Sequence, residues 1–234
     1  MIQVVGIGPG RREGRTIAAD DALRRAEVIV GYTTYVELVR DEFAEKRFVT
    51  TGMRGEKERC VQALLLSREG RRVALICSGD AQVYGMASLL LGMAEEGDEI
   101  EVVPGVTAAL SAAAVLGSPL CGDFAVVSLS DRLTPWETIE KRLLAAASAD
   151  FSIAIYNPVS HGRPEHLKRA CEVLLRVLPE SRLCGIVRNI GRPGESRRIL
   201  TLGALRDAQA DMFCTVFIAN SAAKELFVNL VTPR

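Results

Sequence analysis

The sequence predicts an α/β protein made of two α/β domains, with mainly parallel or mixed sheets and a cleft between the domains. Short β-branched runs alternate with amphipathic stretches along the chain, as expected for strands joined by crossover helices. Several of these runs end in glycine-rich loops. The small, helix-breaking residues 117–119 divide the 234 residues into halves of ordinary domain size. We therefore expect domains at residues 1–117 and 118–234.

The first half begins with an apolar run over residues 2–7 that leads into Gly8, Pro9 and Gly10, a pattern typical of a buried strand and a tight loop. A helix is expected over residues 16–26, where Thr16 can cap the first turn. Further strands are expected at residues 27–31, 48–51, 72–77 and 100–103. Further helices are expected at residues 34–42, 55–69, 85–93 and 106–116.

The second half repeats this alternation of strands and helices. Strands are expected at residues 124–128, 151–156, 183–188 and 214–219, with a further one at 198–202. Helices are expected at residues 136–148 and 165–178. The pattern therefore predicts the same architecture in both halves.

Composition excludes several classes of protein. Hydrophobic residues are 48% of the chain, too many for a disordered protein. The 29 basic and 29 acidic residues cancel, and aromatic residues are only 5%, which weighs against a nucleic-acid partner. The six cysteines form no CxxC pair, and no apolar stretch reaches the length of a membrane helix. We expect a cytoplasmic protein without a bound metal or a membrane partner.

The candidate binding residues lie in the loops after the strands, where an open α/β sheet binds its ligand. The first loop departs from a dinucleotide fingerprint, because Arg11 replaces the last glycine and Pro9 lacks a backbone donor. In the loop at residues 78–80, Gly79 allows close approach of a ligand. Asp80 suits a ribose or a cationic ligand, or else simply caps the next helix. Thr107 has the same two interpretations.

Arginines gather near the first loop although the net charge is zero. Arg11, Arg12 and Arg15 follow it closely, and Arg54 lies in a second loop. Because a guanidinium binds carboxylates in a fixed geometry, this cluster indicates a substrate with several carboxylates, with an ordinary solvated surface as the alternative. In the second half, Asp131 is a candidate general base. The two histidines lack the spacing of a metal site, which favours a surface or capping role.

Four segments taken together resemble the tetrapyrrole methylases, enzymes that use S-adenosylmethionine as the methyl donor. These segments are VGIGPG at 5–10, SGDA at 78–81, VPGVTA at 103–108 and AIYNP at 154–158. The resemblance implies a homodimer that holds the donor in the cleft between its two domains and releases S-adenosylhomocysteine. It places the donor beside Pro9, Ser78, Gly79, Asp80, Val83, Thr107, Ala108, Tyr156, Asn157 and Asn189. Ala81 departs from the family pattern, which usually has proline there.

Further segments are similar to one branch of that family. They are GYTTY at 31–35, TTGMR at 50–54, SLSD at 128–131, TPWE at 134–137 and GIVRN at 185–189. This resemblance implies methylation of C17 of a tetrapyrrole, either precorrin-3B or cobalt-factor III, with ring contraction, in cobalamin biosynthesis. We expect Asp131 and Ser128 to assist the chemistry. Substrate contacts are expected at Gly8, Gly10, Arg11, Arg12, Arg15 and Arg54. Methylation at another ring carbon, and a sensor that binds a nucleoside or tetrapyrrole without catalysis, are the alternatives.

Overall fold

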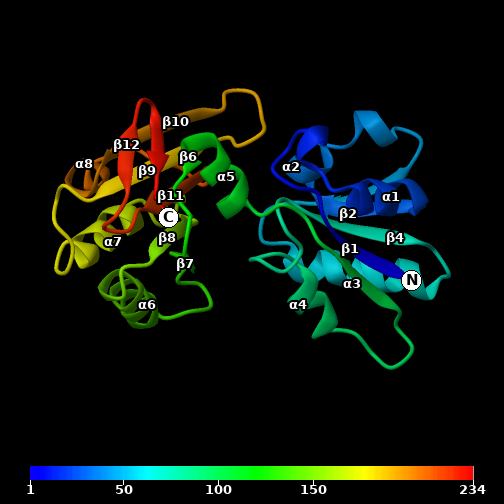
Figure 1. The fold of residues 1–234 in the computed structure, drawn as a ribbon. Coiled ribbons are helices and arrows are strands. Elements are labelled where there is room, and N and C mark those ends of the chain that lie inside the picture. The colour runs from blue at the N-terminus through cyan, green and yellow to red at the C-terminus, as the bar shows by residue number, and fades with distance from the viewer. Residues whose placement is uncertain (234) are drawn as a thin grey trace. The chain divides into compact units, whose positions relative to one another are not determined.

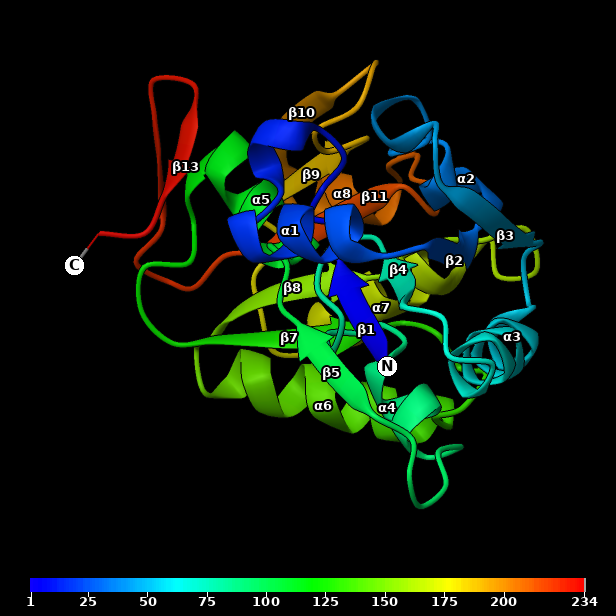
Figure 2. The same cartoon turned by 90° about the vertical axis from the view of Figure 1, so that its right-hand side faces the viewer.

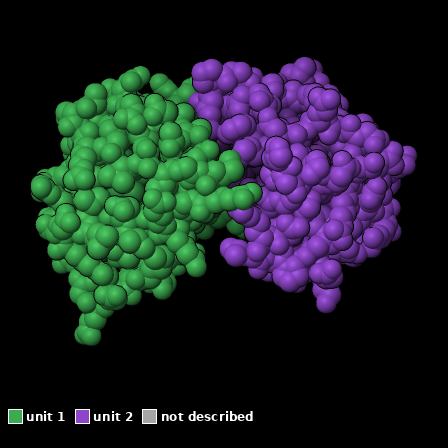
Figure 3. Space-filling view, turned by 180° about the vertical axis from the view of Figure 1, so that it is seen from behind, with its two compact units in different colours: residues 1–108 green, residues 109–234 purple. Residues whose placement is uncertain are grey.

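The computed structural model describes residues 1–233 and divides into two compact units, residues 1–108 and residues 109–234 (Figure 3). Each unit contains a five-stranded sheet with helices packed on it. The predicted α/β fold class is therefore confirmed. The predicted cleft between the halves stays a prediction.

Unit 1 contains a sheet whose neighbouring strands are all parallel, in the order β3-β2-β4-β1-β5 (Figure 1). Its strands are β1 (Ile2–Gly6), β2 (Val28–Tyr32), β3 (Arg47–Thr51), β4 (Val73–Cys77) and β5 (Ile100–Val103). Its helices are α1 (Ile17–Arg25), α2 (Thr33–Val36), α3 (Glu56–Arg68) and α4 (Ala87–Leu91), with 3-10 turns η1 (Arg12–Gly14) and η2 (Asp41–Phe43). Parallel pairing brings the carboxyl ends of the strands to one edge of the sheet.

The central strands of unit 1 are buried on both faces, because their alternate side chains enter two separate cores. Val5 and Ile76 pack with Leu23 of α1, and Val4 and Leu75 belong to the core that contains α3 and α4. Strands covered on both faces are continuously apolar. This is why the short runs at residues 2–6 and 73–77 could be predicted as strands.

Unit 2 contains a mixed sheet in the order β10-β9-β11-β8-β7 and a small sheet in the order β12-β13-β6. Its strands are β6 (Gly117–Ser118), β7 (Phe124–Ser128), β8 (Ser152–Tyr156), β9 (Leu183–Arg188), β10 (Ser196–Thr201), β11 (Cys214–Ile218), β12 (Lys224–Leu226) and β13 (Asn229–Val231). Its helices are α5 (Ala108–Leu116), whose first residue belongs to unit 1, α6 (Trp136–Ser148), α7 (His166–Leu174) and α8 (Leu202–Arg206).

The core of unit 2 lies between its large sheet and helices α6, α7 and α8. Figure 2 shows α6 running alongside β7, and the two pack together. Strand β8 is parallel to β7 and antiparallel to β11, and β11 is antiparallel to β9. The carboxyl ends of β7, β8 and β9 therefore share one edge of the sheet, which is where the candidate residues of this unit lie.

The boundary between the two units lies at the start of α5, earlier in the chain than the sequence indicated. Leu116 fills the space beside Gly185 on β9, where a Cβ would come within 2.5 Å of a Leu116 methyl group. The Arg197 guanidinium donates to the carbonyl of Val115. These contacts tie most of α5 to unit 2, so the structure divides at residues 108 and 109 whereas the sequence indicated a boundary after Gly117.

One predicted helix is wrong, and several short elements were not predicted. In place of a helix over residues 34–42, α2 ends at Val36 and the chain continues through turns into η2. This segment buries only Val36, Val39 and Phe43, too few apolar side chains to favour a long amphipathic helix. The elements missed by the sequence prediction are α8 and strands β6, β12 and β13, which are short or lie at the edge of the fold.

Candidate active site

The loops after β1 and β4 are joined by their own backbone. Gly8 N–H donates to the Gly79 carbonyl at 3.0 Å, and Gly79 N–H donates to the Gly8 carbonyl at 2.8 Å. Gly8 and Gly79 have φ values of 72° and 70°, which favour glycine. A two-bond bridge thus joins the first two glycine loops. Close approach of a ligand to Gly79 stays a prediction.

The loop after β5 meets the same point. A Cβ at Gly105 would lie 2.2 Å from the Gly79 carbonyl oxygen and 2.4 Å from that of Gly6, and a Cβ at Gly6 would lie 2.8 Å from Gly105 N. Since all of these contacts are with backbone, no side chain can rotate away to make room. The structure thus brings together three of the loops that the sequence singled out.

The Asp80 carboxylate ties these loops together. One oxygen accepts from the N–H groups of Gln82, at 2.8 Å, and Val83, at 3.1 Å, and the other accepts from Gly105 N–H at 3.0 Å. Burial raises the pKa of Asp80, but the backbone donors, Gly105 foremost, lower it by more, so the carboxyl pKa lies below its usual value. These donors lie in loops, whereas the next helix, α4, begins only at Ala87 and has no side-chain cap. The alternative that Asp80 caps the next helix is therefore wrong: its carboxylate joins two loops instead.

The other residues predicted to touch the donor in unit 1 lie on the same loops. Ser78 follows β4, and Thr107 directly precedes Ala108, the first residue of α5. The Pro9 ring is close to Gly14, where a Cβ would come within 2.8 Å of the proline Cγ. Thr16 caps α1 as predicted, accepting from Ala19 N–H, and its hydroxyl also donates to the Pro104 carbonyl. The first and third loops are therefore linked by a side chain as well.

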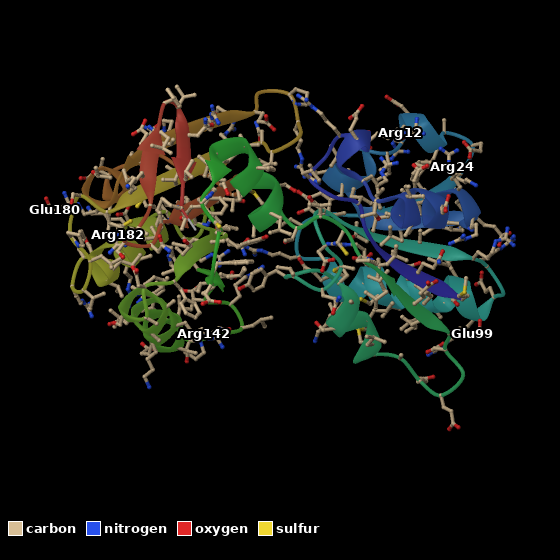
Figure 4. All side chains as sticks on the ribbon, in the orientation of Figure 1. Arg12, Arg24, Glu99, Arg142, Glu180 and Arg182 are labelled. Atoms are coloured by element: carbon tan, nitrogen blue, oxygen red, sulfur yellow. The ribbon has the colours of Figure 1, made fainter. Side chains whose placement is uncertain are left out.

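The four arginines predicted to bind substrate differ in their surroundings. The Arg15 side chain is only 2% exposed and pairs with Asp20 and Glu42, each at 3.0 Å. Arg12 (Figure 4) is 61% exposed and lies 3.8 Å from Glu42, and Arg11 and Arg54 are exposed. Because the Arg15 guanidinium already pairs with two carboxylates of its own unit, the structure argues against its predicted role as a substrate contact.

In unit 2, side chains rather than glycines join the loops after β7 and β8. These two strands are parallel neighbours, with Ser128 opposite Tyr156. Asn157 Nδ2 donates to Ser128 Oγ at 2.9 Å, and the backbone of Asn157 has a φ of 53°. The Tyr156 hydroxyl accepts from Ala109 N–H at 2.7 Å. The structure thus brings together the predicted residues Ser128, Tyr156 and Asn157.

Asn189 lies on a separate part of the same edge. It follows β9, which β11 separates from β8. Its φ is 53°, and its side-chain amide donates to the Pro193 carbonyl at 3.5 Å. The left-handed backbone at both Asn157 and Asn189 gives each strand the same type of ending, which asparagine tolerates better than most residues.

Asp131 has partners that the sequence analysis did not assign to it. His166 Nε2 lies 2.9 Å from Asp131 Oδ2, and Arg163 Nη1 lies 3.8 Å from Oδ1. The hydrogen bond with His166 is the main reason that the pKa of Asp131 is lowered. A carboxyl with a lowered pKa is a weak base near neutral pH. Asp131 is therefore better suited to act as a fixed negative charge than as the general base predicted from the sequence.

The remaining chemistry of the described residues is limited. Burial raises the pKa of the Cys77 thiol to about 11 and that of Cys171 to about 12, so both are poor nucleophiles. Residues 1–233 contain no group of three or more His, Cys, Asp or Glu side chains placed to bind a metal ion. Within the same residues, no helix combines the length and the hydropathy needed to cross a membrane.

The fold and these loops define an α/β protein with a candidate binding edge in each unit. The candidate edge of unit 1 is built from backbone groups, and that of unit 2 from hydrogen-bonded polar side chains. Residues 1–206 match the family described as Tetrapyrrole (Corrin/Porphyrin) Methylases. The chain belongs to this family, which confirms the resemblance found in its sequence.

Individual relatives resemble the whole chain. A probable cobalt-factor III C(17)-methyltransferase of Salmonella typhimurium is 43% identical over 100% of this chain and 98% of its own length. A precorrin-3B C(17)-methyltransferase of a Sinorhizobium species is 37% identical over 94% of this chain and 88% of its own length. The crystal structure of the methyltransferase CobJ has a TM-score of 0.92 at 38% identity and covers 99% of each chain.

Proposed function

We propose that this protein methylates C17 of precorrin-3B or cobalt-factor III, with ring contraction, in cobalamin biosynthesis, and that S-adenosylmethionine is the methyl donor. The observation that carries the proposal is the similarity to the two C17-methyltransferases, which spans nearly the full length of both relatives. The sequence segments of the C17 branch, such as SLSD at 128–131, point the same way.

The loops of unit 1 fit a donor of this kind. Gly79 has no side chain to cover its backbone, and its Cβ position lies 3.5 Å from Ala108 N. That amide belongs to the first turn of α5, and a helix N-terminus favours a carboxylate such as that of the donor's amino-acid part. We assign donor contacts in this unit to Pro9, Ser78, Gly79, Val83, Thr107 and Ala108, with Asp80 shaping their loops.

In unit 2 we assign donor contacts to Tyr156, Asn157 and Asn189. Tyr156 and Asn157 stand at the carboxyl end of β8, and Asn189 stands at the carboxyl end of β9. Amide groups and a phenol supply both donors and acceptors, the pattern that adenine and ribose require. The left-handed backbone at Asn157 and Asn189 fixes the direction in which each side chain leaves the main chain.

The tetrapyrrole carries several carboxylates, and exposed arginines suit them. Arg11, Arg12 and Arg54 are exposed on the loops after β1 and β3, and a guanidinium binds a carboxylate through two parallel hydrogen bonds. Gly10 is half-buried on the first loop and has no side chain that would obstruct a flat ring. Gly8 is buried, and its Cβ position lies 2.4 Å from the Gly14 carbonyl oxygen, so we assign it to the substrate only through the shape that it gives the loop. Arg15 is not assigned to the substrate, because it is buried in its own ion pairs.

The protein's contribution to the reaction is positioning. When bound, the donor supplies a methyl group already activated by the positive charge on sulfur. The residues of both units therefore bind and orient the donor and the tetrapyrrole, and they exclude water. No protein nucleophile is needed. Ser128 and Asp131 stand beside this chemistry as hydrogen-bonding groups. The ionised Asp131 can accept a hydrogen bond from an N–H or O–H group of the substrate, which fixes the orientation of the ring.

The test is incubation of the protein with methyl-labelled S-adenosylmethionine and, separately, precorrin-3B and cobalt-factor III. We expect label at C17 of a ring-contracted product from at least one substrate. Label at another carbon would identify a sister methylase, and binding without transfer would identify a sensor. Calorimetry with S-adenosylhomocysteine gives an earlier answer, since failure to bind at micromolar concentration would contradict the choice of donor.

We also propose that the protein acts as a homodimer in the cytoplasm. The resemblance to dimeric tetrapyrrole methylases supports the dimer, and the reduced cysteines support the compartment. Sedimentation velocity at several protein concentrations tests the oligomeric state. A monomer at every concentration would contradict that part of the proposal.

A further inference from the structure

The loops that follow β7 and β8 are fastened together by polar side chains along their length. At the strand ends, Asn157 bonds Ser128. Further out, Arg163 Nη1 donates to Ser130 Oγ at 2.6 Å, and Arg163 Nε donates to Ser160 Oγ at 3.0 Å. Since each loop is held at more than one point, the position of the Asp131 carboxylate is set by its neighbours as well as by its own backbone.

Both oxygens of Asp131 face a positively charged or hydrogen-donating group. Oδ2 lies 2.9 Å from His166 Nε2, and Oδ1 lies 3.8 Å from Arg163 Nη1. The Asp131 side chain is 36% exposed, whereas those of Arg163 and His166 are 18% and 14% exposed. The carboxylate therefore reaches solvent, while the two groups that hold it are mostly covered.

His166 is itself held in place. It is the first residue of α7, and its ring meets the Trp136 ring edge-on with 5.2 Å between centroids. The Arg169 guanidinium lies over the same Trp136 ring, 4.2 Å from its centroid. Among the charged groups of this cluster, Asp131 contacts the imidazole itself, Arg163 contacts Asp131, and Arg169 contacts Trp136. A ring fixed by an aromatic contact loses little further freedom when it makes a hydrogen bond.

We propose that His166 is a positioning residue that acts through Asp131: its Nε2–H donates to the carboxylate and fixes the orientation in which Asp131 accepts a hydrogen bond from the tetrapyrrole. Arg163 supports the other carboxylate oxygen. This inference rests on the proposed function. It identifies His166, for which the sequence favoured a surface or capping role, and Arg163, which the sequence did not single out, as substrate-orienting residues of unit 2.

The kinetic test compares two variants of His166 with a matched control. H166F keeps a ring against Trp136 but removes the donor, and H166Q keeps a donor nitrogen. H161F alters the other histidine of the chain, which is exposed. We expect H166F to lower kcat/KM for the tetrapyrrole by about tenfold, the value of one charge-assisted hydrogen bond. The KM for the donor should not change, H166Q should retain most of the rate, and H161F should match the wild type.

The pH profile gives a readout that a purely structural role would not change. Because the His166 hydrogen bond lowers the pKa of Asp131, that pKa should rise toward its usual value in H166F. As the solution is acidified, Asp131 of the variant should then lose its negative charge at a higher pH than Asp131 of the wild type. The value of kcat/KM should fall over the same range. The same acid limb in H166F and wild type would overturn the proposal, and so would equal impairment of H166F and H166Q.

A second measurement does not depend on the folding of H166F. Only two histidines are present in the sequence, so nitrogen-15 NMR resolves both imidazoles, and H161F assigns them. In the neutral imidazole of His166 we expect the proton to be on Nε2. The His166 resonances should shift in D131N, while those of His161 should not. A proton on Nδ1 would overturn the inference. Wild-type protein that transfers no methyl group would instead contradict the proposed function and leave this hydrogen bond intact.

Discussion

The candidate binding edges of the two units are built from different chemical groups. In unit 1, the loops contact one another mainly through glycine backbone. The Gly8–Gly79 bridge joins two of these loops, and the Asp80 carboxylate joins its own loop to Gly105. In unit 2, the corresponding loops are joined through side chains, among them Asn157, Asp131 and His166. Backbone packing tolerates almost no added volume, whereas polar side-chain contacts respond to charge and pH. The two edges should therefore fail in different ways when residues are changed.

Gly105→Ala is the most severe test of the backbone-built edge. The new methyl group would lie 2.2 Å from the Gly79 carbonyl oxygen and 2.4 Å from that of Gly6. We expect it to lower the free energy of unfolding by about 4 kcal/mol or to prevent folding. Gly52→Ala is the control, since nothing lies within 4 Å of its Cβ position. Urea unfolding measures both, and similar stabilities would show that the three loops are not closely packed in solution.

Arg15→Met tests whether the charged contacts in unit 1 are structural. The Arg15 side chain is 2% exposed and pairs with Asp20 and Glu42. Its loss removes a buried charge and leaves Asp20 paired only with Arg24, and Glu42 only with the more distant Arg12. The free energy of unfolding should fall by about 3 kcal/mol. Arg12→Met should leave stability nearly unchanged and raise the KM for the tetrapyrrole. The reverse pattern, a stable Arg15 variant with weakened substrate binding, would restore the original prediction for Arg15.

Asp80→Asn removes the charge that ties the loops of unit 1. The amide cannot accept from all three backbone donors, so the free energy of unfolding should fall by about 2 kcal/mol at neutral pH. The folded pKa of Asp80 is lowered, so its contribution is present above the unfolded pKa and is lost as the pH falls through the folded one. The stability difference between wild type and variant should therefore shrink on acidification. An equal substitution at exposed Asp21 should show no such trend.

Asn157→Ala tests the edge of unit 2 and should have the smallest effect. It removes the hydrogen bond to Ser128 and places alanine at a φ of 53°, for a loss of about 1 kcal/mol in unfolding free energy. Asn157→Gly removes the same bond but relieves the backbone, so it should be less destabilising. If glycine is worse than alanine, the left-handed turn is not what asparagine provides at this position.

The sequence was most informative where burial imposes a repeating pattern. The run at residues 73–77 is apolar at every position because both faces of β4 are covered. After it, Gly79 has a positive φ of 70°, and a Cβ at Gly85 would lie 2.2 Å from the Ala81 carbonyl oxygen. Loops of this kind could be placed at one sheet edge because each follows a strand, and the carboxyl ends of parallel strands share an edge. The segment at residues 34–42 contains too few buried side chains to determine its form, and there the prediction of a helix was wrong.

The ion pairs and charged hydrogen bonds of the candidate site could not be predicted from the sequence. Arg15 reaches Glu42, and Asp131 reaches His166, across 27 and 35 positions of the chain. The second contact depends on β7 and β8 being adjacent and parallel, which sets their following loops side by side. The available signal was that Asp131 and His166 each follow one of these strands, but strand order within a sheet is not visible in a single sequence.

The bridge between Gly8 and Gly79 lies directly beyond the ends of the parallel strands β1 and β4 and joins their loops by an antiparallel pair of hydrogen bonds. Amide protons in such a position exchange with solvent only when the central strands open, so these loop amides should be among the slowest of the unit. A segment of this kind behaves as part of the core rather than as a flap. A small molecule that binds there meets a surface already in its final form, and little conformational entropy is lost on binding.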